Sequence, residues 1–274
     1  MRARLAVEES GSGEPLVLVH GIATDRHIWD LVVPMLATSR RVVTLDLPGF
    51  GRSQPVGDGF VLDAVADRIA RGLAGRGVRG PIDLVGHSLG GGVAIALAAL
   101  RPRLVGRLIL VAPAGMRPLP APISRLLAAS ADAALSARRR AVSLTEVAWG
   151  RRLLLAMTAA DGADLPPTLA RQMVEASSTA RRTEAALATI TSSDLRPVLA
   201  RVAAPLGVIW GEADRTIPLK ALSGVTNARP DARVLMLPDA GHVPMVEQPQ
   251  GFTDALELLL EGLPLPLRLR AKLI

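Results

Sequence analysis

Short apolar runs recur along the chain and alternate with longer segments whose apolar residues are three or four positions apart. The runs are nearly continuous in apolar character, which is typical of parallel strands covered on both faces. We predict strands at residues 15–20, 41–47, 81–86, 108–113, 206–211 and 233–238. Helical spacing predicts helices over residues 61–73 and from Phe252 to Leu263. The alternation predicts an α/β fold in which right-handed βαβ units form a doubly wound, mostly parallel sheet.

This rhythm stops between residues 116 and 196, where Ala, Leu and Arg dominate and no strand is predicted. The segment LPPTLARQM at 165–173 places proline at the start of a helix, a position that proline favours. We therefore expect a helical insertion at 116–196 within a core made of residues 1–115 and 197–274.

Composition narrows the class of protein. Hydrophobic residues make up 49% of the 274 residues and charged residues 21%, which is typical of a globular chain with a large core. The absence of cysteine excludes disulfides and thiolate metal sites. The first ten residues lack the apolar core of a signal peptide, and the longest apolar run, residues 93–100, is too short for a membrane span. We expect a cytoplasmic protein without an integral membrane segment.

The net charge of +7 raises the question of nucleic acid binding. The chain has no tyrosine or cysteine and only two lysines, Lys220 and Lys272, so a modest excess of arginine explains its high isoelectric point. Aromatic residues make up 2% of the chain, too few for base stacking, and we expect no nucleic-acid partner. The tail LPLPLRLRAKLI at 263–274 is either a loosely held end or a basic amphipathic contact with a membrane or partner.

Candidate chemistry centres on the stretch DLVGHSLGGG around Ser88. A predicted strand runs directly into Gly-His-Ser-Leu-Gly and an alanine-rich helix follows, so Ser88 lies on a sharp turn between strand and helix. Such a strained turn presents a serine hydroxyl as a nucleophile, whereas in an ordinary glycine-rich turn Ser88 has no chemical role. Gly86 and Gly90 leave room for strand and helix to approach, and Gly91 and Gly92 let the helix lie close to the sheet.

Five motifs, taken in order, make the chain similar to the α/β-hydrolase fold family. They are LVHG (18–21), DLPGFGRS (46–53), GHSLGG (86–91), GEADRTIP (211–218) and GHVPMVEQP (241–249). The resemblance implies Ser88 as nucleophile, Asp214 as acid and His242 as base, in the order expected of this fold. The family has two strands before its LVHG loop, and residues 1–10 have room for one, so we expect seven or eight strands.

The residues themselves suit this chemistry. A serine hydroxyl becomes a good nucleophile when an imidazole accepts its proton, and His242 follows the last predicted strand in a loop above the sheet. Asp214 follows the preceding strand, and its task is to orient the imidazole, with Glu212 and Asp239 as alternative acids.

Acyl transfer also needs backbone N–H donors for the oxyanion, which we assign to Ile22 and Leu89. The predicted substrate pocket is drawn from the HG loop, the insertion and the loop of the base. Its residues are His20, Gly21, Met116, Trp149, Met157, Met173 and Val243. The alternative for the three methionines and Trp149 is an ordinary place in the core.

We therefore expect a serine hydrolase that cleaves a small-molecule carboxylic ester through an acyl-enzyme, with the insertion as a cap. Ser88 stands where the related epoxide hydrolases and haloalkane dehalogenases have an aspartate, so those chemistries are not expected. Alternatives on the same triad are a C–C bond hydrolase, a lactonase, a cofactor-free haloperoxidase-type perhydrolase and an acyltransferase. A hydrolase-fold binding protein without turnover is the alternative of another class. No cofactor or metal is expected, and the oligomeric state is left open.

Overall fold

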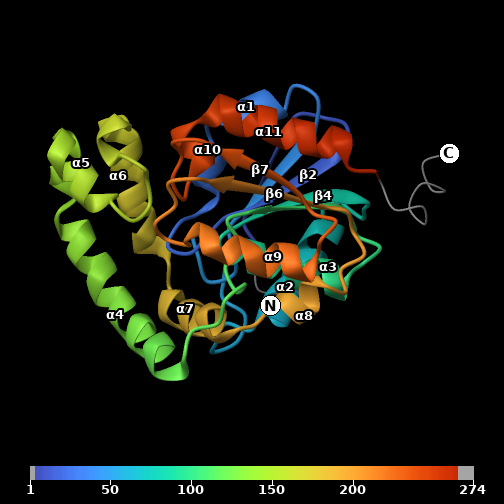
Figure 1. Cartoon of the computed structure of the whole chain (residues 1–274), viewed down its shortest axis with the longest axis horizontal. Coiled ribbons are helices and arrows are strands. Elements are labelled where there is room, and N and C mark those ends of the chain that lie inside the picture. Colours follow the sequence, from blue (N-terminus) through green and yellow to red (C-terminus); the bar gives the residue numbers. More distant parts are fainter. Residues whose placement is uncertain (1–3, 265–274) are drawn as a thin grey trace.

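The centre of the computed structural model, which describes residues 4–264, is a seven-stranded sheet with the order β1-β3-β2-β4-β5-β6-β7 (Figure 1). The strands are β1 (Val7–Ser10), β2 (Pro15–Val19), β3 (Arg41–Leu45), β4 (Ile82–His87), β5 (Val105–Val111), β6 (Leu206–Gly211) and β7 (Arg233–Leu237). β1 pairs with β3 in antiparallel fashion, and every other neighbouring pair is parallel. The prediction of a mostly parallel sheet is confirmed, with seven strands.

Helices cover both faces of this sheet. The α-helices are α1 (Val33–Leu36), α2 (Leu62–Ala74), α3 (Leu89–Leu100), α4 (Ala121–Arg140), α5 (Ala148–Leu154), α6 (Pro167–Ala176), α7 (Thr183–Ser192), α8 (Arg196–Leu199), α9 (Leu222–Ala228), α10 (Pro244–Glu247) and α11 (Pro249–Gly262). The 3-10 helices are η1 (Arg26–Trp29), η2 (Val142–Glu146), η3 (Gly162–Asp164), η4 (Ser177–Thr179) and η5 (Leu219–Ala221). In Figure 1, α2, α3 and α9 lie on one face, and α1 and α11 lie on the other.

This arrangement explains the continuous apolar character of the strands. Successive side chains of a strand point to opposite faces, so a sheet covered twice needs apolar residues at every position. In β2, Val17 and Val19 pack into the core that holds α2 and α3, while Leu16 and Leu18 pack into the core that holds α1 and α11. All four side chains are fully buried.

Predicted and observed boundaries differ by a few residues. β5 begins at Val105, three residues before the predicted start, because Val105 already pairs with Ile82 although Gly106 and Arg107 interrupt the apolar run. The final helix, predicted from Phe252, begins earlier with a proline at its first turn.

Residues 116–196 contain helices and no strand, as the sequence predicts. These helices, α4 to α7, lie together at the left side of the sheet in Figure 1, coloured green to yellow. Among residues 4–264, no helix is long and apolar enough to cross a bilayer. The two alternatives given for the tail fall mainly on residues 265–274, which lie outside the described residues.

Candidate active site

Ser88 lies at the junction of β4 and α3 with φ 53° and ψ −117°, a backbone conformation that favours glycine. Hydrogen bonds to the end of β5 and the segment after it help to hold it there. Its N–H donates to the carbonyl of Val111 (3.0 Å), and its carbonyl accepts from the N–H of Ala114 (3.0 Å). Such a conformation costs about 1–3 kcal/mol and persists only where the surrounding structure fixes it. The predicted sharp turn is present, with Ser88 4% exposed.

Close packing accounts for the glycines of this turn. A Cβ on Gly90 would lie 2.3 Å from the carbonyl oxygen of His20, and a Cβ on Gly86 would lie 2.5 Å from the carbonyl oxygen of Gly90. Gly92 differs from the prediction that it faces the sheet. Its Cβ would meet Ile190 of α7 at 2.5 Å, so the missing side chain makes room for the insertion.

His242 and Asp214 are joined by a hydrogen bond of 2.8 Å between Nδ1 and Oδ2. The other carboxylate oxygen of Asp214 accepts from the N–H groups of Thr216 (2.8 Å) and Ile217 (2.9 Å). Asp214 is 7% exposed and His242 5%, so water screens this pair weakly. With Nδ1 committed to the carboxylate, Nε2 of His242 is the ring atom available to exchange a proton.

The alternative acids lie elsewhere. Glu212 and Asp239 are both exposed, and among the described residues the carboxylate that accepts a hydrogen bond from the His242 ring is that of Asp214. Asp214 therefore stays the candidate for the acid.

Two contacts fix the backbone of His242. Its N–H donates to the carbonyl of Thr158, in the insertion (2.9 Å), and its carbonyl accepts from Nε2 of His87 (2.8 Å). Burial lowers the pKa of His87 well below its usual value, and the nearby His242 lowers this pKa further. A neutral His87 carries one ring proton, which it keeps on the nitrogen that bonds to His242. His87, the residue before Ser88 in the Gly-His-Ser-Leu-Gly turn, thus holds the loop of the candidate base in place.

Glu247, in α10, holds the same loop from another direction. Its carboxylate accepts from the N–H groups of Ala160 (2.7 Å), Gly241 (3.0 Å) and Val243 (3.2 Å). Burial raises the pKa of Glu247, and these N–H groups oppose the rise because they stabilise the charged form. Sequence reasoning assigned no role to this glutamate. The available signal is an acidic residue within the GHVPMVEQP motif, five residues after His242.

His20 shapes the loop that follows β2. Its Nδ1 donates to the carbonyl of Gly21 (2.7 Å), and its Nε2 accepts from the N–H of Leu47 (2.8 Å). Accepting at Nε2 requires a neutral ring, and burial lowers the pKa of His20. His20 is fully buried and ties this loop to the chain after β3.

The loop after β2 lies directly against the candidate nucleophile. A Cβ on Gly21 would lie 3.1 Å from the Cβ of Ser88. Among the described residues, neither the N–H of Ile22 nor that of Leu89 donates a hydrogen bond. Ile22 directly follows Gly21, and Leu89 directly follows Ser88. Both N–H groups are therefore available to donate to a ligand atom beside the serine.

The side chains predicted for a substrate pocket do not gather in one place. Met116 lines a cavity of about 330 Å³, and Met173 lines a separate one of about 20 Å³. Val243 is 1% exposed and belongs to the core. Trp149 and Met157 lie at the surface, 60% and 59% exposed.

Local packing explains the exposure of Trp149. The close contact of α5 is made by the next residue, Gly150, whose Cβ would lie 2.1 Å from the carbonyl oxygen of Leu144. Since Gly150 faces inward, the neighbouring tryptophan faces solvent.

The insertion contacts the loops at the carboxyl ends of the strands. The N–H of Arg181 donates to the carbonyl of Gly49 (2.9 Å), and Oγ1 of Thr189 donates to the carbonyl of Phe60 (2.8 Å). Together with the Thr158 carbonyl, these bonds attach the insertion to the loops after β3 and β7.

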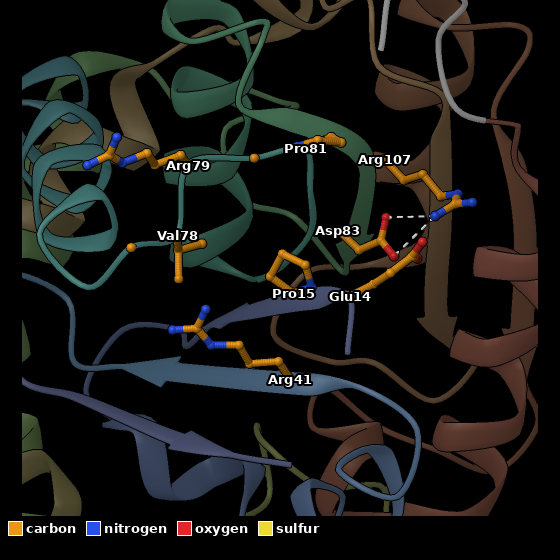
Figure 2. A pocket seen from close by; sticks show the side chains of 10 residues that line it. Glu14, Pro15, Arg41, Val78, Arg79, Pro81, Asp83 and Arg107 are labelled. Carbon is orange, nitrogen blue, oxygen red and sulfur yellow. Dashed lines mark hydrogen bonds and ion pairs between the residues drawn. The ribbon is translucent and has the colours of Figure 1, made fainter. Parts of the chain in front are cut away.

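Another cavity, of about 290 Å³, opens at the opposite edge of the sheet, where the parallel strands begin (Figure 2). Its buried carboxylate, Asp83, forms ion pairs with Arg40 (2.7 Å) and Arg107 (3.0 Å). Burial raises the pKa of Asp83, and Arg107 opposes the rise. These charges satisfy one another, and Ser88 lies beyond the other end of β4, so the candidate active site is at the carboxyl edge.

Known proteins resemble this chain along most of its length. The sequence model of the family described as "Alpha/beta hydrolase family" matches residues 16–255. The pimeloyl-[acyl-carrier protein] methyl ester esterase of Nitrosomonas europaea is 31% identical, covering 94% of this chain and 100% of its own. The 2-hydroxymuconate semialdehyde hydrolase of a Pseudomonas species is 40% identical over 117 residues, 41% of each chain. A thermophilic esterase from Thermogutta terrifontis has a TM-score of 0.75 at 28% identity, covering 94% of this chain and 93% of that one.

Proposed function

The chain belongs to the alpha/beta hydrolase family, and from this premise we propose that it is a serine hydrolase that cleaves a carboxylic ester through an acyl-enzyme. The observation that carries the proposal is the buried Asp214–His242 hydrogen bond at the edge of the sheet where Ser88 occupies a strained turn. Esterases among the relatives that match nearly the whole chain support an ester as the substrate.

In the proposed reaction, the Oγ of Ser88 attacks the ester carbonyl carbon while Nε2 of His242 accepts the hydroxyl proton. The carbonyl oxygen becomes an oxyanion and accepts hydrogen bonds from the N–H groups of Ile22 and Leu89. Asp214 stabilises the imidazolium without taking its proton. The tetrahedral intermediate then collapses, the C–O bond to the alcohol breaks, and His242 protonates the departing oxygen.

The second half repeats these roles with water. His242 accepts a proton from the water that attacks the acyl carbon, and it returns this proton to Oγ of Ser88 as the acid departs. The neutral His87 lies beside His242, with ring centroids 4.7 Å apart, so no second charge opposes formation of the imidazolium.

We propose that residues 116–196 form the cap over this site. Hydrogen bonds from the insertion to the loops after β3 and β7 support this role, as does the burial of Ser88. A cap that excludes water strengthens the electrostatic interactions beneath it.

A C–C bond hydrolase is a second candidate on the same residues. The similarity to a semialdehyde hydrolase favours it, but that match spans 41% of the chain. Substrate trials separate the two, since both reactions require the same nucleophile.

A panel of p-nitrophenyl esters of increasing acyl length tests the proposal, with Ser88→Ala as the inactive variant and Ser12→Ala, at an exposed loop serine, as the matched control. We expect turnover by the parent and the control, and a loss of about 10³-fold or more in Ser88→Ala. A fluorophosphonate probe followed by mass spectrometry is expected to label Ser88. Labelling at another serine, or equal turnover by Ser88→Ala, would refute the assignment.

A further inference from the structure

The cavity of about 330 Å³ that Met116 lines shares backbone segments with the turns that hold two candidate catalytic residues, Ser88 and Asp214. Its walls come from the segment after β5, from α7 and from the segment after Asp214. Ala114 in the first segment donates its N–H to the carbonyl of Ser88 (3.0 Å), and Ile217 in the last donates to Asp214 (2.9 Å). The same backbone that fixes the nucleophile and the acid therefore forms two walls of this cavity.

The interior of the cavity is mainly apolar. Each wall contributes at least one of its larger hydrophobic side chains, which are Met116, Leu119, Ile190 and Ile217. Met116 is 2% exposed and Ile190 is 3% exposed, so these walls are fixed by core packing. Such a surface binds a hydrocarbon chain through burial of apolar area.

The charged residues that line the cavity are all cations. Arg117 and Lys220 line it from two different segments, and no aspartate or glutamate does. Neither side chain forms an ion pair within the described residues, in contrast to Arg40, Arg41 and Arg107, which pair with carboxylates at the sheet. Among the described residues, the Asp214 carboxylate forms an ion pair with His242 and none with Arg117 or Lys220.

We propose that this cavity binds an ester whose apolar chain ends in an anionic group, with Arg117 and Lys220 facing the anion. The inference rests on the proposed ester hydrolysis and adds the substrate class, monoesters of medium-length aliphatic dicarboxylic acids. The chain lies along Met116, Ile190 and Ile217, and the ester carbonyl reaches Ser88. The charged end provides orientation, since a neutral chain has no group for the two cations to hold.

The test compares monomethyl suberate with methyl octanoate, which share an eight-carbon acyl chain and differ in the terminal carboxylate. The measured quantity is the ratio of their kcat/KM values, from methanol release at low salt. We expect a ratio above 1 in the parent. Arg117→Gln and Lys220→Gln each lower it by about 2- to 5-fold, chiefly through KM for the suberate ester, and the double variant lowers it further.

Arg103→Gln is the matched control, because Arg103 is an exposed arginine near the opposite edge of the sheet. It is expected to leave the ratio unchanged, while 0.5 M NaCl lowers the parent ratio by screening. A parent ratio at or below 1, or a double variant with the parent ratio, overturns the inference and leaves the proposed hydrolysis intact.

Failure of the hydrolysis itself gives a different result, in which neither ester is cleaved and Ser88 is not labelled. Calorimetric titration of Ser88→Ala protein with monomethyl suberate then measures binding without turnover. We expect binding that weakens when Arg117→Gln and Lys220→Gln are added. No detectable binding, or binding that these changes do not affect, overturns the inference independently of catalysis.

Discussion

Replacing Glu247 with alanine removes the carboxylate that joins the loop of His242 to the insertion. Three backbone N–H groups, those of Ala160, Gly241 and Val243, lose their acceptor. Hydrogen bonds to a charged group contribute about 1.5–3 kcal/mol each. Glu247 lines an open cavity of about 420 Å³, so water reaches some of the freed donors and compensates in part. We expect a net loss of about 2–4 kcal/mol in the free energy of unfolding.

Urea unfolding measures this change, with the slope m compared between parent and variant. Glu261→Ala is the matched control, since Glu261 is an exposed glutamate near the end of α11, and its effect is expected within about 0.5 kcal/mol. Because His242 belongs to the same loop, the kcat of ester cleavage falls as well in Glu247→Ala folded at low temperature. A Glu247→Ala protein with the parent's urea midpoint and the parent's kcat would refute the reasoning.

Three further predictions rest on backbone geometry and on buried histidines. Ser88→Gly is expected to be more stable than Ser88→Ala by about 0.5–2 kcal/mol in urea unfolding, because glycine adopts the positive φ without strain and alanine does not. Equal stabilities of the two variants would show that the backbone at residue 88 is not strained. Burial lowers the pKa of His20 and of His87, so below pH 6.5 the unfolded chain binds protons that the folded chain does not. Stability therefore falls as the pH drops from 7 to 5, by up to about 1.4 kcal/mol per pH unit for each histidine, and His87→Gln is expected to reduce the slope measured by urea unfolding. Gly90→Ala forces a Cβ against the carbonyl of His20, and we expect it to lower the free energy of unfolding by about 1–3 kcal/mol and to lower kcat. Gly75→Ala is the control, because the nearest atom to a Cβ there is 3.5 Å away, and equal effects of the two changes would exclude a specific clash.

The sequence predicts the sheet and the turn around Ser88 because both depend on local pattern. A continuous apolar run must be buried on both faces, and a serine between glycines at a strand-to-helix junction has few alternative conformations. The motif order also brings Asp214 and His242 to the correct edge, since the carboxyl ends of parallel strands meet there. Their contact follows from topology.

Within the insertion, the sequence predicts helices but not which of their side chains are buried. In α4, Ser124 and Ala128 are buried, whereas Leu126 is 71% exposed, so hydrophobic spacing there does not report which face packs. Trp149 is predicted to line a pocket, yet it is exposed, and the glycine beside it makes the close contact. The bond between Thr158 and His242 uses a backbone carbonyl, which every residue carries, and no side-chain pattern marks it.

That same bond limits how this protein could be re-engineered. A chimera that exchanges the whole of residues 116–196 for another family member's segment also replaces the partner of the histidine's N–H, so the imported backbone must place a carbonyl at the same point. Grafts confined to residues 121–154 leave Thr158 and Ala160 in place. Directed evolution of substrate preference is therefore expected to tolerate crossovers early in the insertion and to reject those that fall between α5 and η3.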